Sequence, residues 1–212
     1  MSREVKRPFG GLREEHVALT ERRILEAGTR LFLERGYVGT SLLAVAELAR
    51  VAPRTVYVRF GTKARLLDRC IGASVAGDGS EGSQFNRSHD IAFAAPTLDE
   101  RIRALADLSS GIMDRSAALL AVGSQAAAIE PEIAAMEMAG LLNALNQLRA
   151  FAERLEADDM LPKGLSAEGL TDTLWALAGP RTIVSFVSDR NWNSDQFAGW
   201  LVSTLRFLLR AG

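Results

Sequence analysis

Several features common in extracellular and membrane proteins are missing from this sequence. Cys70 is its only cysteine, so no disulfide can form within the chain, which fits a reducing compartment. No N-terminal run has the apolar core of a signal peptide, and no apolar stretch approaches the roughly 20 residues that span a bilayer. We therefore expect a cytoplasmic protein that folds without disulfides and makes no contact with a membrane.

Signatures of catalysis and of metal binding are also missing. The two histidines, His16 and His89, lie in segments without clear helical periodicity, where neither is a good general base. No Cys/His spacing suggests zinc, and the chain has no Gly-rich phosphate loop and no nucleophile elbow around a serine. We predict that the protein is not an enzyme and uses no cofactor and no metal; an all-α enzyme is the alternative. Cys70 is assigned to the core in preference to an oxidation sensor.

Strand signals are a third absence, because no segment alternates apolar and polar residues, and the predicted fold class is all-α. Helical spacing and end signals predict helices over residues 20–36, 42–49, 53–60, 62–76, 97–111, 114–128, 131–157, 166–187 and 194–210. Gly179 and Pro180 should interrupt or kink the helix that contains them. The domains predicted are a flexible basic arm (1–19), a first helical domain (20–76), a flexible connection (77–96) and a larger helical domain (97–212).

An uneven distribution of charge lies beneath a net charge of −1. Residues 1–69 hold 14 Lys and Arg against 8 Asp and Glu, whereas residues 70–212 hold 11 against 18. A basic first third joined to an acidic remainder indicates that only the first third meets a polyanion. Ordinary surface charge is an equally good explanation when this observation stands alone.

Two short helices joined by the turn at residues 50–52 form a helix-turn-helix pattern, braced by the longer helix before them. The second helix of such a pair must fit the major groove of DNA, so it should be short, with an apolar back and a polar front. Residues 53–60 meet this requirement, because Val56 and Phe60 can both face the core. The opposite side carries Arg54, Thr55 and Val58.

Candidate DNA contacts follow from the chemistry of these side chains. Arg54 can reach guanine acceptors or a phosphate, and Thr55 can present a hydroxyl or a methyl group to base edges. The hydroxyl of Tyr57 can meet a phosphate, and Lys63 adds charge beside helix N–H groups that favour phosphate. Two hydroxyls ahead of the second helix can approach the DNA backbone, although a role as helix caps explains them equally well. The predicted DNA-binding set is Thr40, Ser41, Pro53, Arg54, Thr55, Tyr57, Val58, Arg59 and Lys63.

The run from Arg22 to Leu67 resembles the DNA-binding domain of the TetR family. The residues that carry the resemblance, in order and at the family's spacing, are Ile24-Leu25-Glu26-Ala27, Phe32, Gly36-Tyr37, Thr40-Ser41, Val45-Ala46, Val51, Thr55-Val56-Tyr57, Phe60, Lys63 and Leu66-Leu67. The resemblance implies a homodimer that binds a palindromic operator in double-stranded DNA, usually as a repressor that a small ligand releases. It also implies that residues 53–60 are the recognition helix, with phosphate contacts from Thr40 or Ser41, Tyr57 and Lys63.

Three departures from the family pattern affect the turn and the DNA contacts. Arg50 stands where glycine is usual, so we expect the turn to adopt a conformation that accepts a side chain. Ala52 stands where a serine-type cap is common, which removes one capping contact. Leu43 and Ala44 occupy positions that are often polar, so we expect the second helix to make fewer DNA contacts.

The C-terminal region carries a second resemblance to the TetR family, in Leu174-Trp175-Ala176-Leu177-Ala178-Gly179-Pro180, Asp189-Arg190-Asn191-Trp192-Asn193-Ser194, Trp200-Leu201 and Thr204-Leu205. In such proteins the last two helices of each subunit form a four-helix bundle across the dimer axis. Two apolar stripes suit helix packing of this kind, either within one subunit or between subunits. The predicted dimerisation set is Ile183, Phe186, Val187, Phe197, Trp200, Leu201, Leu205 and Leu208.

The middle helices are predicted to enclose a small hydrophobic ligand, uncharged or weakly polar, because apolar and adaptable side chains dominate their faces. The predicted ligand-binding set is Met113, Leu120, Met136, Leu142, Phe151 and Trp175. Ordinary core packing is the better explanation for any single one of these residues. A DNA-binding regulator without a small-molecule ligand is therefore a second alternative.

Overall fold

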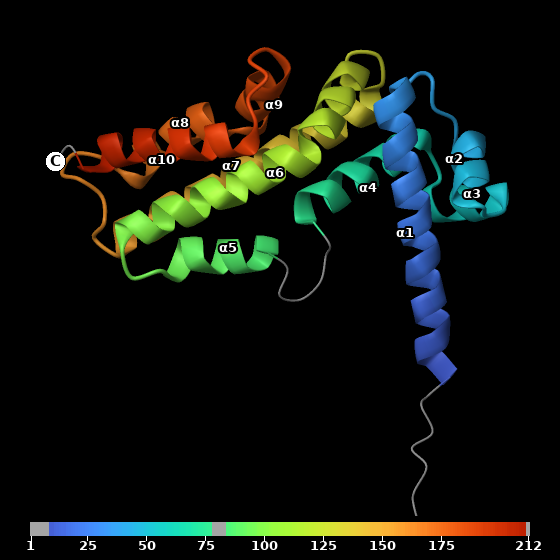
Figure 1. Cartoon of the computed structure of the whole chain (residues 1–212), viewed down its shortest axis with the longest axis horizontal. Coiled ribbons are helices and arrows are strands. Elements are labelled where there is room, and N and C mark those ends of the chain that lie inside the picture. Colours follow the sequence, from blue (N-terminus) through green and yellow to red (C-terminus); the bar gives the residue numbers. More distant parts are fainter. Residues whose placement is uncertain (1–8, 78–83, 211–212) are drawn as a thin grey trace, which may run out of the picture. The chain divides into compact units, whose positions relative to one another are not determined.

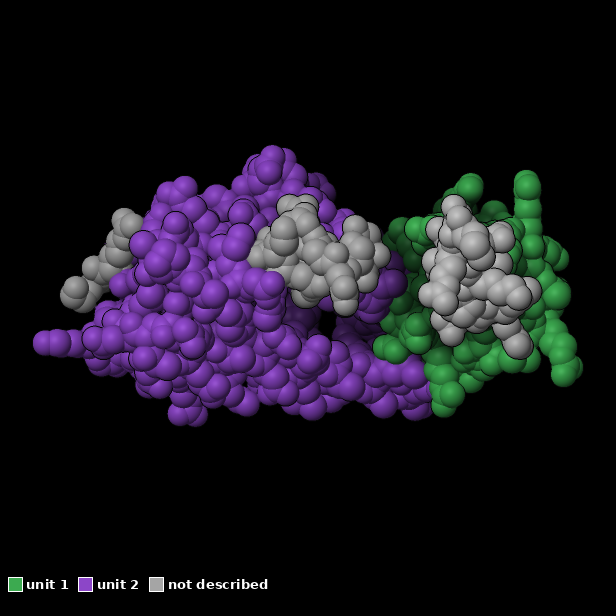
Figure 2. Space-filling model, turned by 90° about the horizontal axis from the view of Figure 1, so that it is seen from below, with its two compact units in different colours: residues 1–70 green, residues 71–212 purple. Residues whose placement is uncertain are grey.

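The computed structural model describes residues 9–77 and 84–210, and within these ranges the chain is all-α, with ten helices and no strand. This fold class is the one that the sequence predicts. The chain divides into two compact units, residues 1–70 and residues 71–212 (Figure 2). The division falls inside a continuous helix rather than in a loop.

The first unit consists of α1 (Phe9–Arg35), α2 (Leu42–Ala49), α3 (Pro53–Phe60) and the first half of α4 (Lys63–Ala76) (Figure 1). Helix α2 packs against both α1 and α3. The apolar faces of these helices meet in a core whose fully buried side chains include Ile24, Phe32, Val45, Val56 and Leu66. These are positions that the helical spacing of apolar residues already assigns to the interior.

Helix α1 begins at Phe9, so the prediction of a loose arm over residues 1–19 is wrong for residues 9–19. Thr20, where the sequence predicts the helix to begin, lies inside it, and its hydroxyl donates a hydrogen bond to the carbonyl of His16 at 2.7 Å. Threonine can satisfy its hydroxyl on the preceding turn as readily as it caps a helix start, so the residue type alone does not locate the helix end. Residues 1–8 lie outside the described part of the chain.

The second unit consists of the end of α4 and six further helices. These are α5 (Gln84–Ala94), α6 (Leu98–Ala127), α7 (Pro131–Ala157), α8 (Ala167–Ala178), α9 (Pro180–Ser188) and α10 (Ser194–Arg210). Helix α6 is central, since it contacts α5, α7, α9 and α10, and Figure 1 shows α5 and α10 on opposite sides of it. The core around α6 includes Ile102, Met113, Phe151, Leu174 and Phe197.

Two predictions about this unit are corrected. Residues 98–127 form one helix rather than two, because Gly111 continues the helix instead of ending it. Helix α5 occupies residues 84–94 of the predicted flexible connection, of which residues 78–83 lie outside the description. The secondary structure of these segments is therefore determined by packing against the neighbouring helices rather than by a single glycine or a polar composition.

The predicted break at Gly179 and Pro180 is confirmed, because α8 ends at Ala178 and α9 starts at Pro180. A Cβ atom on Gly179 would lie 2.4 Å from the carbonyl oxygen of Trp175, so only glycine fits this bend. The loop after α9 leads to α10, and the residue that caps α10 is Asn193. Its side-chain oxygen accepts a hydrogen bond from the Gln196 N–H at 2.9 Å, and Gln196 accepts one from the Asn193 N–H.

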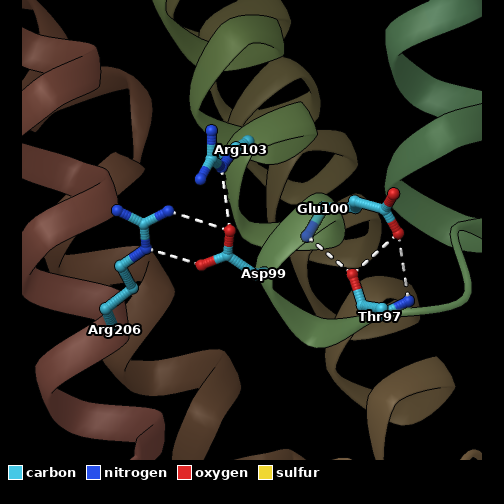
Figure 3. A network of polar contacts seen from close by, with 5 residues as sticks. All are labelled: Thr97, Asp99, Glu100, Arg103 and Arg206. Carbon is cyan, nitrogen blue, oxygen red and sulfur yellow. Dashed lines mark hydrogen bonds and ion pairs between the residues drawn. The ribbon is translucent and has the colours of Figure 1, made fainter.

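The start of α6 is held by a polar network (Figure 3). Thr97 and Glu100 form a capping box, in which each side chain accepts a hydrogen bond from the other residue's backbone N–H. Asp99 accepts two hydrogen bonds from the Arg206 guanidinium of α10, at 2.6 and 2.9 Å, and also pairs with Arg103 at 2.9 Å. These contacts, led by the hydrogen bond from Arg206, lower the pKa of Asp99 from 3.8 to about 2.

Arg101, on the same turn of α6, is 3% exposed. Its Nε donates to the carbonyl of Ala95 at 2.7 Å, and its Nη2 lies 2.5 Å from Oδ2 of Asp158, the residue that ends α7. The guanidinium lowers the pKa of Asp158. The side chain therefore joins the start of α6 to the end of α7 from inside the unit.

Arg115 makes a comparable connection farther along α6. Its Nε and Nη2 donate to the carbonyls of Ser74 and Val75, at 3.0 and 3.1 Å, in the last turn of α4. A Cβ atom on Gly111 would lie 3.0 Å from Nη1 of Arg115, so the glycine makes room for the guanidinium. The end of α4 is thereby capped by a side chain from another helix.

Candidate nucleic-acid interface

Helix α3 presents three of the predicted DNA-binding side chains on one face. Arg54, Tyr57 and Val58 have the i, i+3 and i+4 spacing that places side chains together on a helix. All three are exposed, Tyr57 by 52% and Val58 by 73%, whereas Val56 and Phe60 are buried on the opposite side. The helix therefore has the apolar back and the open front that insertion into a major groove requires.

The start of α3 relies on proline rather than on a side-chain cap. Pro53 is the first helical residue, where its missing N–H would have no partner in the helix. Ala52 makes no capping hydrogen bond, as the sequence predicts, although its carbonyl accepts a hydrogen bond from the Thr55 N–H at 2.8 Å. Thr55 is half-buried, so less of its surface than of Arg54's is open to solvent.

The turn between α2 and α3 keeps a left-handed conformation at Arg50, with φ 54° and ψ 48°. The expectation of a conformation that accepts a side chain is therefore wrong, because this region of the backbone favours glycine. The Arg50 N–H donates to the carbonyl of Glu47, and the guanidinium of Arg23 donates to the carbonyl of Ala49 at 2.6 Å. These hydrogen bonds at the end of α2 hold the turn in its strained conformation.

The two hydroxyl residues before α2 have different roles. Ser41 is the N-cap, because its exposed side chain accepts a hydrogen bond from the Ala44 N–H at 3.1 Å. Thr40 is 3% exposed, and its hydroxyl donates to the carbonyls of Leu31 and Gly36. Thr40 therefore ties the turn to α1 from within, and of the two hydroxyls only that of Ser41 lies open to a phosphate.

Lys63, at the start of α4, is engaged within the unit. Its Nζ donates to the carbonyl of Tyr37 at 2.7 Å and lies 4.1 Å from the centre of the Tyr37 ring, a cation–π contact. The lysine therefore holds the first turn of α4 against the turn that follows α1. A phosphate contact by Lys63 stays a prediction, and it would have to share the ammonium group with these contacts.

Glu21 of α1 pairs with two arginines. It forms ion pairs with Arg69 of α4 and with Arg59 of α3, the latter at 3.7 Å. Arg59, a predicted DNA contact, is half-buried in this arrangement. Arg54 is consequently the cation that α3 itself presents fully to solvent.

Sequence reasoning gave no role to Glu21 and Arg23, which the structure places around the helix-turn-helix. Their partners lie 26 to 48 residues away along the chain. Helical spacing carries no signal for pairings at such distances, so only the fold reveals them. Tyr37 was part of the family pattern, but its support of Lys63 was not inferred.

The second unit has a groove of about 320 Å³ between α7, α8 and the start of α9. Its walls are mainly apolar, and Arg181 and Thr182 lie at its edge. The lining residues include Met138, Leu141, Leu142, Leu145 and Trp175. Of the six predicted ligand-binding residues, Leu142 and Trp175 line this groove. Met113 and Phe151 are fully buried in the core, and Leu120 and Met136 are half-buried elsewhere on α6 and α7.

The predicted dimerisation residues separate into two groups. Ile183, Phe197, Leu201 and Leu205 are buried within the single chain, so they pack in its own core and cannot touch a partner without rearrangement. Phe186, Val187 and Trp200 are half-buried, and Leu208 is 39% exposed. Phe186 stacks on Trp192 with ring centres 4.4 Å apart and packs against Trp200 in a tilted arrangement at 4.9 Å, which makes one aromatic surface at the α9–α10 corner.

Among the described residues, no group of His, Cys, Asp and Glu side chains is arranged to hold a metal ion. In the same ranges, no helix combines the length and the apolar character needed to cross a bilayer. Cys70 is buried against Gly28 and Leu66 of the first unit, and burial raises the pKa of its thiol to about 11.

Comparisons with known proteins begin with the sequence. Residues 24–70 match the model of the family described as bacterial regulatory proteins, tetR family. No curated protein matches the chain at a significant level.

Solved structures share the fold along most of the chain. A TetR-family transcriptional regulator from Rhodococcus sp. is 13% identical with a TM-score of 0.68, and 91% of this chain and 99% of that one are covered. FadR from Bacillus subtilis in complex with stearoyl-CoA is 17% identical with a TM-score of 0.67, covering 89% and 97%. A transcriptional regulator from Saccharomonospora viridis in complex with choline is 18% identical with a TM-score of 0.65, covering 88% and 95%.

A helix-turn-helix that exposes a cation and an aromatic hydroxyl on its second short helix is typical of DNA-binding transcription regulators. The family match covers residues 24–70, so this segment is similar to the DNA-binding region of tetR-family regulators, and the solved structures share the fold along most of the chain.

Proposed function

We propose that this chain is a transcription regulator of the TetR type, a cytoplasmic repressor that binds a palindromic operator as a homodimer and dissociates when a small hydrophobic molecule binds its second unit. The observation that carries the DNA-binding part is the open face of α3, where Arg54, Tyr57 and Val58 lie together above a buried apolar back. Two copies of this face, related by a twofold axis, would read two half-sites about one helical turn of DNA apart, or a multiple of it.

The aromatic surface at the α9–α10 corner supports dimerisation. Phe186, Trp192 and Trp200 pack together into a preformed apolar surface, and large aromatic groups of this kind are common at the centres of protein interfaces. Leu208 and the 75% exposed Phe207 extend the apolar character along α10. In this proposal the buried residues Phe197, Leu201 and Leu205 support the interface from behind rather than touching the partner.

The apolar groove supports ligand sensing. Leu142 and Trp175 offer a hydrophobic site of small-molecule size, and Met138 beside them is an adaptable side chain. FadR from Bacillus subtilis binds stearoyl-CoA and the Saccharomonospora viridis regulator binds choline, so proteins with this fold take chemically different ligands. The lining of this groove favours an apolar molecule, and a ligand that binds it would bias the helices α7, α8 and α9 around it.

The DNA-binding proposal is tested by selection of duplexes from a random library with the full-length protein, followed by fluorescence anisotropy on the enriched sequence. We expect a palindrome, and affinity that falls with rising salt. Arg54→Ala should weaken specific binding about tenfold or more, the discrimination expected from one base contact. Arg190→Ala, which removes an exposed arginine from the second unit, is the matched control and should bind as wild type does. Failure to enrich any sequence would contradict the proposal.

Dimerisation and ligand sensing have separate tests. Analytical ultracentrifugation should give a dimer for the wild type and a shift toward monomer for Trp200→Ser, with Ile129→Ser as an exposed apolar control.

Ligand sensing is tested with a series of alcohols and uncharged esters of increasing chain length, which should raise the thermal midpoint and release the operator. Leu142→Glu should abolish both effects. A ligand that stabilises wild type and this variant equally would exclude the groove as its site.

A further inference from the structure

The DNA-facing surface of α3 carries a strongly exposed apolar side chain. Val58 is 73% exposed, so it contributes nothing to the core, and a β-branched residue is a poor helix former. The folding of an eight-residue helix would be served better by alanine or lysine at this position. The valine is therefore better explained by a contact between α3 and a binding partner than by the stability of the helix.

The cations near Val58 narrow what that partner surface can be. Arg59 is held by Glu21 at 3.7 Å, and Lys63 is bound to the carbonyl of Tyr37. Arg54 and Val58 thus lie one helical turn apart on the same face, one fully charged and one fully apolar. A row of phosphates would favour further cations beside Arg54, whereas a base edge with a methyl group would favour valine.

We infer that Val58 is a specificity-determining residue that reads the C5-methyl group of a thymine in each operator half-site, next to a base pair contacted by Arg54. This inference rests on the proposed DNA-binding function. In the major groove thymine presents a methyl group, the only apolar group among the base edges there. The valine methyls would bury it and displace water from both surfaces.

The spacing along α3 sets where this thymine lies. Four residues advance the helix by about 6 Å, which corresponds to about two base-pair steps of 3.4 Å each along the groove. The thymine is therefore expected within about two base pairs of the guanine that the Arg54 guanidinium prefers. A palindromic operator holds one such thymine in each half-site.

The test removes one methyl group at a time from the operator obtained by selection. Each thymine is replaced in turn, symmetrically in both half-sites, by deoxyuridine, which differs from thymine only by that methyl group. For wild type, one replacement should weaken binding about fourfold per half-site, and about fifteenfold for both, the fold-change expected for one buried methyl group at each. The other replacements should change the affinity little.

Val58→Ala provides the second arm of the experiment. This variant should bind the thymine operator as weakly as wild type binds the deoxyuridine operator, and the same deoxyuridine replacement should then have no further effect. Ile129→Ala, an exposed apolar residue in the second unit, should respond to deoxyuridine as wild type does. Circular dichroism checks that all variants keep the same helix content.

Two outcomes overturn the inference. An operator on which no deoxyuridine replacement distinguishes wild type from Val58→Ala would show that Val58 does not read a thymine methyl, while sequence-specific DNA binding would still stand. A selection that enriches no sequence at all would remove the proposed function together with this inference.

Discussion

Arg54 on α3 and Arg101 on α6 are the same type of residue in contrasting surroundings. Arg54 is exposed on the face of a short helix, whereas Arg101 is 3% exposed and bonded to Ala95 and Asp158. The contrast extends to their units. In the second unit Arg115 and Arg206 also join one helix to the backbone or to a carboxylate of another.

A single chain thus uses the arginine side chain for two purposes. An arginine whose N–H groups donate hydrogen bonds to helix ends inside the protein stabilises the fold, and these N–H groups are not available to a ligand. An arginine left in solvent adds little to stability and keeps its donors for a partner. In the first unit Glu21 sets the balance between these uses, since it decides how many arginines around α3 stay engaged.

Removal of a buried arginine from the second unit should have the largest effect on stability. Arg101→Ala removes a buried side chain and the charged hydrogen bonds that join α6 to α7, and it should lower the free energy of unfolding by about 2–3 kcal/mol. Arg103→Ala, two residues later but on the exposed side, should cost about 0.5 kcal/mol or less. Denaturant titration measures the free energy of unfolding of both variants. Equal losses of stability would contradict the different roles assigned to buried and exposed arginines.

Glu21→Gln releases the arginines that are held near α3 in the first unit. Freeing Arg59 and Arg69 should raise the affinity for non-specific DNA several-fold at low salt. The slope of log affinity against log salt should steepen by about one for each arginine that gains a phosphate. The exposed neighbour Glu26→Gln should change the slope less. Salt titrations by fluorescence anisotropy test this, and an unchanged slope would mean that Glu21 holds no DNA-competent arginine.

Arg50→Gly probes the strain between the two short helices. Glycine adopts the left-handed conformation at this position without the steric penalty of a side chain, so the free energy of unfolding should rise by about 0.5–1 kcal/mol. Arg50→Ala is the control, because it removes the same charge and keeps the strain. Equal stability of the two variants would attribute the effect to charge rather than to the backbone.

The smallest effect concerns pH. The lowered pKa of Asp99 means that its contribution to stability is complete above about pH 4 and is lost as the pH falls from 3.8 toward about 2. The effect is small because the side chain is partly exposed to solvent. The thermal midpoint of wild type should fall more steeply over this range than that of Arg206→Gln. Arg30→Gln, which removes an exposed pair with Glu34, should follow wild type.

Local chemistry explains which parts of the fold could be predicted. The starts of α2 and α3 were predicted to the residue, because Ser41 and Pro53 are end signals that act within one turn. The start of α1 and the whole of α5 were missed, since neither has a strong apolar stripe. The continuity of α6 through Gly111 depends on Arg115 of the next turn and on α4, which lies far away in sequence.

The candidate site shows the same limit. The positions of Val56 and Phe60 correctly predict that Arg54 and Val58 are exposed, whereas Thr55, assigned to the same face, is half-buried. The burial of Thr40 and the engagement of Lys63 depend on Leu31 and Tyr37, to which no local pattern connects them. Periodicity also could not separate an internal face from an intermolecular one, because apolar spacing is identical in both.

The capped end of α4 has a consequence for local unfolding. The last carbonyls of a helix have no partner within it, so a helix end normally frays and exchanges its amide hydrogens quickly with solvent. Here the guanidinium of Arg115 on α6 donates hydrogen bonds to the carbonyls of Ser74 and Val75. The final turn of α4 therefore opens only when these hydrogen bonds break. The stretch of chain in which the first unit passes into the second should therefore exchange slowly, together with α6, rather than at the rate of a free helix end.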